Sequence, residues 1–334
     1  MSITVMKPGL LVTLQDAGRR GYGRYGIITA GAMDHSAYRI ANRLVGNEDE
    51  KAVLEITWSG FAVEFLRDRW VAITGGDLSP SIEGLKVPMW RPVLIKAGRV
   101  LRFQQPVTGC RAYMAVSGGF DVYQVMGSSS TYLRAGIGGY EGRPLKTGDT
   151  LHTHPSMLPV VSSERYLDDY GGFLTVKWAV FSPERYPGPG QEKVVRVLKG
   201  RQYDDFDDSS KHALFGERFT VTPQSDRMGY RLSGPLLQLS HAKEYISEPV
   251  ALGTVQVPAD GQPIILMADR QTLGGYPKIA QVATVDISLI AQLSPGATIR
   301  FAGISLAEAE QLYSAHVQEF RMLEAMIKLK LKEW

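Results

Sequence analysis

Residues 53–65 read VLEITWSGFAVEF, a stretch dominated by β-branched, aromatic and other apolar residues around a short Ser-Gly break. Runs of this kind are typical of β-strands that end at turns. The 35 Gly and 18 Pro residues are spread along the chain, as many tight turns require. The sequence therefore predicts a mainly β protein. Further strand-like runs lie at residues 70–74, 99–103, 111–116, 193–198, 219–222, 264–268, 281–286 and 298–301.

Helical patterns are fewer than strand patterns. Residues 35–45 (HSAYRIANRLV) follow a candidate N-cap at Asp34 and stop at Gly46, which predicts one helix. A second, short helix is predicted near residues 209–214.

The C-terminal segment predicts the longest helix. It begins with the capping box Ser305-Leu-Ala-Glu308, in which the serine hydroxyl accepts from a backbone amide and the glutamate reaches back. Apolar residues then recur every three or four positions. We expect this stripe to cover a sheet; contact with a partner chain is the alternative. The stripe consists of Ala309, Tyr313, Val317, Phe320, Leu323, Ile327 and Leu331.

Composition and charge argue against several classes of protein. The chain has 334 residues, of which 44% are hydrophobic and 21% charged, with a net charge of +3. No basic excess indicates nucleic-acid binding, and no Lys/Arg run indicates a membrane surface. Residues 1–21 lack the apolar core of a signal peptide, and no stretch approaches the roughly 18 apolar residues of a membrane span. We expect a cytoplasmic protein that binds neither nucleic acid nor membrane.

Cysteine and histidine usage indicates neither a disulfide nor a metal site. Cys110 is the single cysteine, which suits a reducing compartment. Its place in the strand-like run CRAYMAV favours a small buried residue over a reactive thiol. His152 and His154 would share one face of a strand, but no third ligand lies nearby in the sequence. We therefore predict no metal ligands.

Familiar cofactor motifs are missing or out of context. Residues 21–26 (GYGRYG) fit G-x-G-x-x-G, but the sequence IITAGAMD follows instead of a helix, so a dinucleotide site is not supported. The chain contains no P-loop, no CxxC, no HExxH and no G-x-S-x-G nucleophile elbow. The biotin attachment pattern, Lys between two Met residues, is also absent, so we expect no covalent biotin on this chain.

The segment 152–190 looks least like a packed domain, because it is dense in Pro, Ser and Gly. Residues 186–191 are the expected connector between two domains. A short similarity between GRVLRF (98–103) and GATIRF (296–301) fits two related domains, although chance would also explain it. The predicted boundaries are 1–185 for an N-terminal β domain, 191–304 for a C-terminal β domain and 305–334 for an amphipathic helix.

Three segments, 15–34, 225–232 and 253–278, combine glycine turns with polar side chains in a way that a core alone does not need. In the third, the strand-like run IILMA leads directly into Asp269, and a strand end is a rigid platform for polar groups. Asp269 can accept from an amide N–H, and Lys278 can neutralise an oxyanion. Tyr276 offers a stacking ring. We take these three as candidate catalytic residues.

The same segments supply candidate substrate-binding residues. The arginines and the tyrosine of 225–232 favour anion or carboxylate recognition, and the glycine pair allows a ligand to approach the backbone closely. The alternative for each is structural: ion pairs, and a charged turn that fixes a hairpin. The candidates are Arg227, Tyr230, Arg231, Gln256, Arg270, Gln271, Thr272, Gly274 and Gly275.

Taken together, these segments resemble one family. The motifs QDAGRRGYGRYGI, AGAMD, ANRLVGN, RAYMAVSGGFDV, MGSSSTY, GRPLKTGD, SDRMGYRL, GTVQVPADGQPIILMADRQTLGGYPKIA and AQLSPG occur in the order of the KipA, or allophanate-hydrolase-subunit-2, family. The family is also described as the C subunit of 5-oxoprolinase, or as biotin-dependent carboxyltransferase-like. The resemblance covers nearly the whole chain and is weakest at 155–190 and in the last helix.

This resemblance implies two cyclophilin-like β-barrel domains. It also implies two partners within a 5-oxoprolinase complex, a KipI-like B subunit and an A subunit of the LamB/YcsF type. The complex would use ATP to open 5-oxo-L-proline to L-glutamate, by phosphorylation of the amide oxygen and attack of water. The resemblance does not say which subunit binds ATP. It further implies a link to sporulation control through antagonism of a KipI-like kinase inhibitor.

Two other functions stay open from the sequence. One is a carboxyltransferase component that moves a carboxyl group from biotin, held on another chain, to urea or another amide. The other is a non-catalytic regulator that binds a KipI-like protein. The substrates of the two enzymes, 5-oxoproline and urea, both present a planar N–C=O unit. The candidate site at Asp269, Tyr276 and Lys278 would recognise this unit.

Overall fold

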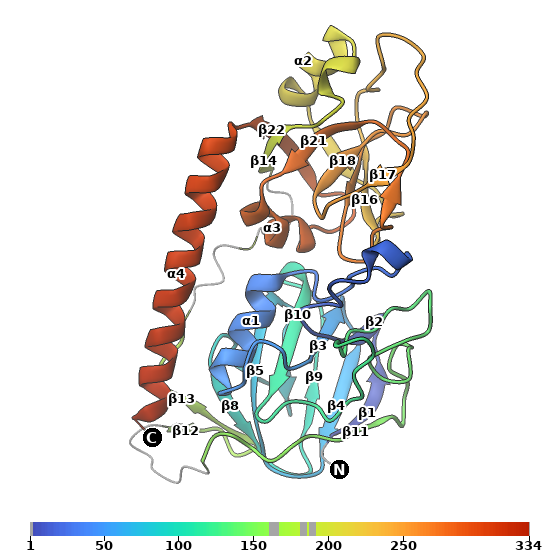
Figure 1. The fold of residues 1–334 in the computed structure, drawn as a ribbon. Helices are drawn as coiled ribbons and strands as arrows, with labels where there is room; N and C mark the ends of the chain where they lie inside the picture. The colour runs from blue at the N-terminus through green and yellow to red at the C-terminus, as the bar shows by residue number, and fades with distance from the viewer. Residues whose placement is uncertain (1–2, 160–166, 181–185, 187–191, 334) are drawn as a thin grey trace. The chain divides into compact units, whose positions relative to one another are not determined.

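The computed structural model describes residues 3–159, 167–180, 186 and 192–333. The chain divides into two compact units, both built mainly from β-strands, as the sequence predicts (Figure 1). The first unit comprises Met1–Arg19, Ala30–Tyr186 and Glu319–Trp334, and the second comprises Arg20–Thr29 and Pro187–Gln318.

Both units are discontinuous in sequence. Residues 20–29 leave the first unit and group with the second, and residues 319–334 return from the second unit to the first. Of the expected connector at 186–191, only Tyr186 lies within the described residues. Local sequence patterns do not reveal such excursions, because they depend on contacts between distant segments.

The first unit consists of two antiparallel sheets, and the stretch 53–65 supplies one strand to each. Val53–Thr57 (β3) belongs to a seven-stranded sheet and Phe61–Phe65 (β4) to a six-stranded sheet. Between them Trp58 and Gly60 have φ values of 61° and 92°, a left-handed backbone that lets the chain cross from one sheet to the other. The two runs therefore do not form a hairpin with each other.

The strand orders show how the two sheets are built. The seven-stranded sheet runs β12 (Leu167–Asp169), β13 (Phe173–Val176), β8 (Pro92–Ile95), β5 (Arg69–Asp77), β10 (Thr108–Val116), β3 and β2 (Leu11–Gln15). The six-stranded sheet runs β11 (Thr150–Leu151), β1 (Ile3–Pro8), β4, β9 (Val100–Arg102), β6 (Ser81–Ile82) and β7 (Leu85–Lys86).

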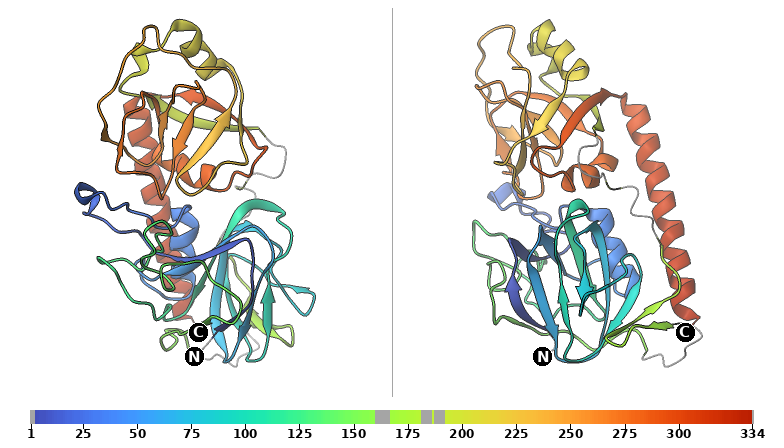
Figure 2. Two further views of the ribbon diagram at one scale, coloured as in Figure 1. Left: turned by 90° about the vertical axis from the view of Figure 1, so that its right-hand side faces the viewer. Right: turned by 180° about the vertical axis from the view of Figure 1, so that it is seen from behind.

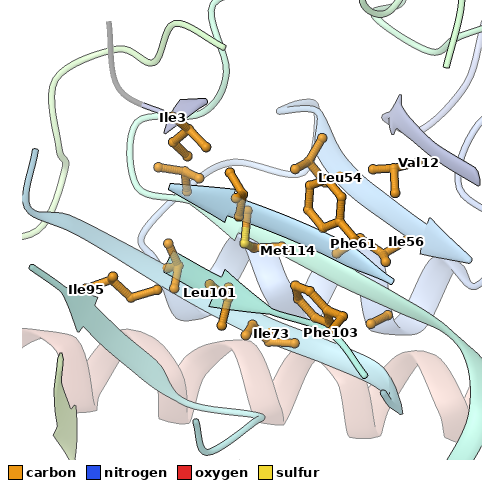
Figure 3. Close-up of a cluster of buried hydrophobic side chains, with 14 of the residues drawn as sticks. Ile3, Val12, Leu54, Ile56, Phe61, Ile73, Ile95, Leu101, Phe103 and Met114 are labelled. Carbon is orange, nitrogen blue, oxygen red and sulfur yellow. The ribbon is translucent and has the colours of Figure 1, made fainter. Parts of the chain in front are cut away.

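The core of the first unit lies between these sheets. Alternate side chains of each strand point inward, so Leu54 and Ile56 of one sheet meet Phe61 of the other (Figure 3). Phe61 also packs against Phe103, with ring centroids 5.9 Å apart. Full burial of side chains of this size contributes roughly 1.5–3 kcal/mol each, which makes this cluster the main stabilising element of the unit.

Helix α1 (His35–Leu44) matches the sequence prediction. The carboxylate of Asp34 caps it by accepting from the backbone N–H of Ala37 at 3.0 Å. Gly46, with φ of 75°, follows its end. The helix packs against the large sheet through a second apolar cluster that includes Tyr38, Leu44, Ala72 and Tyr113.

The second unit contains a closed barrel (Figure 2). Its order is β14 (Lys193–Lys199), β21 (Lys278–Val282), β18 (Thr254–Gln256), β19 (Ile264–Leu266), β16 (Gly229–Ser233), β15 (Phe219–Val221) and β22 (Thr298–Gly303), which pairs back with β14. Each of these strands therefore has two neighbours. Helices α2 (Asp208–Gly216) and α3 (Ile287–Ala291) also belong to this unit, as does a two-strand ladder, β17 (Glu248–Pro249) with β20 (Leu273–Gly274).

One strand prediction is wrong in part. The run 281–286 is a strand only to Val282; residues Thr284–Asp286 form a 3-10 helix (η4) that leads into α3. The carboxylate of Asp286 accepts from the backbone N–H of Arg196 at 2.7 Å and from its guanidinium. This tertiary contact fixes the turn. The β-branched residues of the run favour a strand, so the local sequence gives no sign of the turn.

The last helix, α4 (Leu306–Lys332), begins at the predicted capping box. The backbone N–H of Glu308 donates to the Ser305 hydroxyl at 3.2 Å, and the backbone N–H of Ser305 donates to the Glu308 carboxylate at 2.7 Å. Within the first unit, its predicted apolar stripe packs against the α1 cluster through Phe320, Leu323, Ile327 and Leu331.

Replacement of Ser305 by alanine is expected to destabilise the start of α4. The Glu308 amide loses its acceptor, and the loss of an N-cap costs about 0.5–2 kcal/mol. The measurement is chemical denaturation of the isolated chain, compared with Ser305→Asp, which retains an acceptor and is expected to match the wild type. Equal stability of the alanine variant and the wild type would contradict the capping role.

The structure also places the cysteine, the histidine pair and the G-x-G-x-x-G segment that the sequence analysis considered. Cys110 is buried, whereas His152 and His154 lie at or near the surface. The G-x-G-x-x-G segment contains a 3-10 helix, Gly23–Tyr25 (η1), instead of a strand-to-helix loop. Among the described residues, no group of three or more His, Cys, Asp or Glu is placed to hold a metal ion, and no helix is long and apolar enough to cross a membrane.

Candidate functional site

The second and third polar segments come together in the second unit. Strand β16 pairs with β19, and beyond the strand ends the backbone N–H of Asp269 donates to the carbonyl of Arg227 at 2.8 Å. Their side chains form a bidentate ion pair, with Nε–Oδ2 at 2.9 Å and Nη2–Oδ1 at 3.0 Å. Both side chains are at least nine-tenths buried, at 5% and 8% exposure. Both carboxylate oxygens of Asp269 therefore already accept hydrogen bonds within the chain.

Lys278 begins β21 and is anchored by a residue that the sequence analysis missed. Its Nζ donates to Oε1 of Glu248 at 2.8 Å, from a side chain only 11% exposed. Glu248 also accepts from Gln202 at 2.9 Å, and the backbone N–H of Lys278 donates to Gln202 Oε1 at 3.1 Å. Two side chains from distant parts of the chain thus fix the position of the lysine.

The charge of Glu248 follows from these contacts. The hydrogen bond from Lys278, and then that from Gln202, lower the pKa of Glu248 below its usual range. The carboxylate is therefore ionised at neutral pH. Because its pKa is lower in the folded chain than in the unfolded one, its stabilising effect is present at neutral pH and is lost as pH falls through the lowered value.

Gln256 lies on β18, the strand next to Lys278 in the barrel. Its Cα is the register partner of Lys278, and the residue is 4% exposed. Its Oε1 is buried and has no hydrogen-bond partner among the described residues. A Cβ added at Gly274 would lie 3.2 Å from that oxygen, so glycine keeps the space in front of the amide open. A buried acceptor of this kind is costly unless something donates to it.

Arg270 supplies a second cation beside Val250, the residue that packs against Gly274. Its guanidinium contacts the backbone carbonyls of Val250 and Met267, at 3.5 and 3.3 Å, and no ion pair in the described part of the chain includes it. Burial lowers the pKa of Arg270, although a guanidinium remains protonated. A partly buried cation that is held by carbonyls in this way is suited to bind an anionic group.

The remaining candidate site residues differ in their exposure and in their contacts. Tyr276 is 48% exposed, so its ring is open to solvent. Tyr230 is in the barrel core, where its hydroxyl lies 3.3 and 3.2 Å from the carbonyls of Ala291 and Leu293. Arg231 is exposed on the same strand. The backbone carbonyl of Thr272 accepts from Val250. Gly275 lies close to Ser247, and Gln271 lies close to Gly274.

The first polar segment is part of a buried network in the first unit. The Asp16 carboxylate accepts from the Ser128 hydroxyl, the backbone N–H of Gly18 and two neighbouring serines. Arg19, 1% exposed, donates to the carbonyls of Val125 and Ser130. The motifs QDAGR and GSSST therefore fit together and fix two loops, which accounts for their polarity without a ligand.

The arrangement in the second unit was only partly predictable. Lys278 contacts the β17–β20 ladder through Glu248, and Gly274 belongs to the ladder. Gln256 lies next to Gly274, and Arg270 contacts Val250, which follows β17. No motif marked Glu248 or Gln202, because each acts through contacts with residues 30 to 76 positions away.

Comparison with known proteins gives the family. The profile of the family described as carboxyltransferase domain, subdomain A and B, matches residues 25–303. The chain belongs to this family. This family agrees with the carboxyltransferase-like resemblance seen in the sequence.

Relatives of this chain differ in their activities. The chain is 40% identical to the C subunit of 5-oxoprolinase from Escherichia coli over 308 residues, covering 92% of this chain and 93% of that protein. It is 37% identical to the corresponding C subunit of Haemophilus influenzae, covering 90% of each. The solved structure of K. lactis urea amidolyase superimposes with a TM-score of 0.84 at 29% identity, covering 96% of this chain but 20% of that protein.

Proposed function

We propose that the chain is the C subunit of an ATP-dependent 5-oxoprolinase that opens 5-oxo-L-proline to L-glutamate. The observation that carries this proposal is the match to the Escherichia coli protein over nearly the full length of both chains. A protein of this kind is one part of a multi-subunit enzyme, so the chain acts in a complex. Its proposed partners are a KipI-like B subunit and an A subunit of the LamB/YcsF type.

The site around the β17–β20 ladder suits the chemical groups of 5-oxoproline. The ring presents an amide oxygen, an amide N–H and a separate carboxylate. In the proposal the ammonium of Lys278 faces the amide oxygen, where negative charge grows as the ring opens. The buried oxygen of Gln256 accepts from the ring N–H, and the guanidinium of Arg270 holds the carboxylate.

The other predicted residues support these three. Glu248 positions Lys278, and the exposed ring of Tyr276 covers one side of the substrate. We propose a positioning role for Asp269 in place of the predicted catalytic role. Because Arg227 contacts both of its oxygens, we propose that it fixes the turn that carries Arg270.

ATP, bound by the complex, would supply the phosphoryl group that makes the amide oxygen a good leaving group. The chain has no P-loop, so we assign it no nucleotide motif and restrict its part to binding and polarising the lactam. Water then attacks the ring carbonyl carbon, the ring C–N bond breaks and the nitrogen takes a proton to become the amino group, which leaves an acyl phosphate on the side chain. A second water molecule hydrolyses this acyl phosphate to inorganic phosphate and the side-chain carboxylate of glutamate.

The isolated chain is expected to show no ATP-dependent release of glutamate from 5-oxoproline, whereas the chain mixed with both partners is expected to be active. Glutamate is measured against time, with size-exclusion chromatography at micromolar concentration to detect the complex. Co-elution with the KipI-like partner is expected, with an interface on the order of 1,000 Å² or more. Turnover by the single chain would contradict the proposal, and so would failure to co-elute.

The structural likeness to urea amidolyase favours a second candidate function, carboxyl transfer from biotin to urea or another amide. Activity with a biotin-carrying partner and urea, in place of glutamate release, would establish it. A chain that binds a KipI-like protein but supports neither reaction would instead be the regulator of sporulation control.

A further inference from the structure

The C-terminal half of α4 has a second apolar face that the sequence analysis did not detect. The inner face, with Phe320 and Ile327, is buried against the first unit. On the outer face Met322, Met326 and Leu329 are 59%, 56% and 63% exposed, and Ala325 between them is also exposed. These four define the outer stripe. Exposed large apolar side chains in a continuous row mark interaction surfaces.

The helix is firmly held, so the outer stripe is a rigid surface. The carboxylate of Glu324 pairs with Arg43 at 2.9 Å and with Arg39 at 3.3 Å. The guanidinium of Arg39 also lies over the ring of Phe320, 3.8 Å from its centroid. Binding through the outer stripe therefore requires little ordering of this helix, which favours affinity.

The spacing of the outer stripe is that of a helix that binds in a groove. Its members stand at positions i, i+3, i+4 and i+7, the pattern of anchor residues in helix-in-groove recognition. Two of the four are methionines, whose flexible side chains adapt to a partner surface. A face this small cannot form a stable interface by itself, because each partner of a stable complex contributes about 800 Å². It needs polar contacts at its borders.

One border of the outer stripe is basic. Arg321, Lys328 and Lys332 lie within about 40° of one another around the helix axis at 3.6 residues per turn. No ion pair among the described residues includes any of the three, whereas Lys330 on the other border pairs with Glu333. A cleft of about 550 Å³ opens beside this flank, lined by Lys328 and Lys332 among other residues. Glu48 and Glu324 also line this cleft, but both pair with arginines of α1. Acidic side chains of a partner would therefore pair with the two lysines there.

We propose that the outer stripe of α4 docks into an apolar groove with an acidic rim on another subunit of the complex. The proposal rests on the multi-subunit function proposed above. A second copy of this chain fits less well, because an antiparallel pairing of the two stripes would bring the basic flanks against each other. An acidic rim complements the basic flank, which favours a different protein over a second copy of this chain.

The test is the affinity of the full-length chain for the purified KipI-like and LamB/YcsF-like proteins, each alone and together, by isothermal titration calorimetry. Met326→Glu places a charge in the apolar groove and is expected to weaken binding at least tenfold, while Met326→Leu retains affinity. Leu85→Glu, at a 49% exposed apolar residue elsewhere in the first unit, is the matched control and is expected to bind normally. Unchanged thermal unfolding of Met326→Glu confirms that its fold is intact.

The basic flank has its own expected result. Lys328→Glu is expected to slow association and to reduce its dependence on salt, as removal of a steering charge does. Wild-type affinity of both glutamate variants would overturn the proposal, even if the complex assembles. Self-association of the chain that Met326→Glu abolishes would also overturn it, in favour of a homodimer. If the wild-type chain binds neither protein, the proposed function fails together with this inference.

Discussion

Replacing Lys278 by alanine is expected to lower the turnover of the reconstituted complex by at least about tenfold. The ammonium is held at 2.8 Å from Glu248 in a largely buried position. In the proposed function it stabilises the charge that develops on the amide oxygen. Removing a donor of this kind costs a factor of about 100 or more in well-studied sites. The measurement is steady-state glutamate release, with co-elution of the three proteins as the control for assembly.

A matched control separates the loss of turnover in Lys278→Ala from the effect of removing any lysine that forms an ion pair. Lys86 pairs with Asp77 at the same distance, 2.8 Å, but its side chain is 66% exposed. Surface pairs contribute about 0–1 kcal/mol, so Lys86→Ala is expected to keep normal turnover and stability. Glu248→Gln leaves the lysine in place but removes its charged partner, and an intermediate loss is expected. Wild-type turnover of Lys278→Ala would show that this site is not catalytic.

The second large effect is expected on stability. Asp269→Ala leaves the Arg227 guanidinium without its bidentate partner in a position where the side chain is 5% exposed. Removing one member of a buried ion pair typically costs about 3–5 kcal/mol, because the remaining charge stays desolvated. The free energy of unfolding of the isolated chain, from denaturant titration, is expected to fall by about that amount.

A double variant tests whether the loss of stability in Asp269→Ala comes from the buried charge that remains on Arg227. Arg227→Met combined with Asp269→Leu removes both charges and is expected to be more stable than Asp269→Ala alone. Glu83→Gln, in the surface pair with Arg99, is the exposed counterpart and is expected to change stability by less than about 1 kcal/mol. A loss of less than about 1 kcal/mol in Asp269→Ala would contradict the structural role of the pair.

Features that depend on neighbouring residues were predictable from the amino-acid order. β-branched runs bounded by glycine indicated the mainly β class, because strand preference and turn formation act over a few positions. The caps at Asp34 and Ser305 were predictable for the same reason, since their hydrogen bonds join residues three positions apart. The polar segments around Asp269 and Lys278 were recognisable as strand ends followed by glycines.

The way these pieces combine depends on the folded chain. Folding places the two halves of 53–65 in different sheets and groups residues 20–29 with the second unit. It pairs Asp269 with Arg227, 42 positions away, and Lys278 with Glu248, 30 positions away. It also leaves the outer stripe of α4 exposed. Burial and pairing depend on which distant segments meet in space, and no local pattern of residues contains that information.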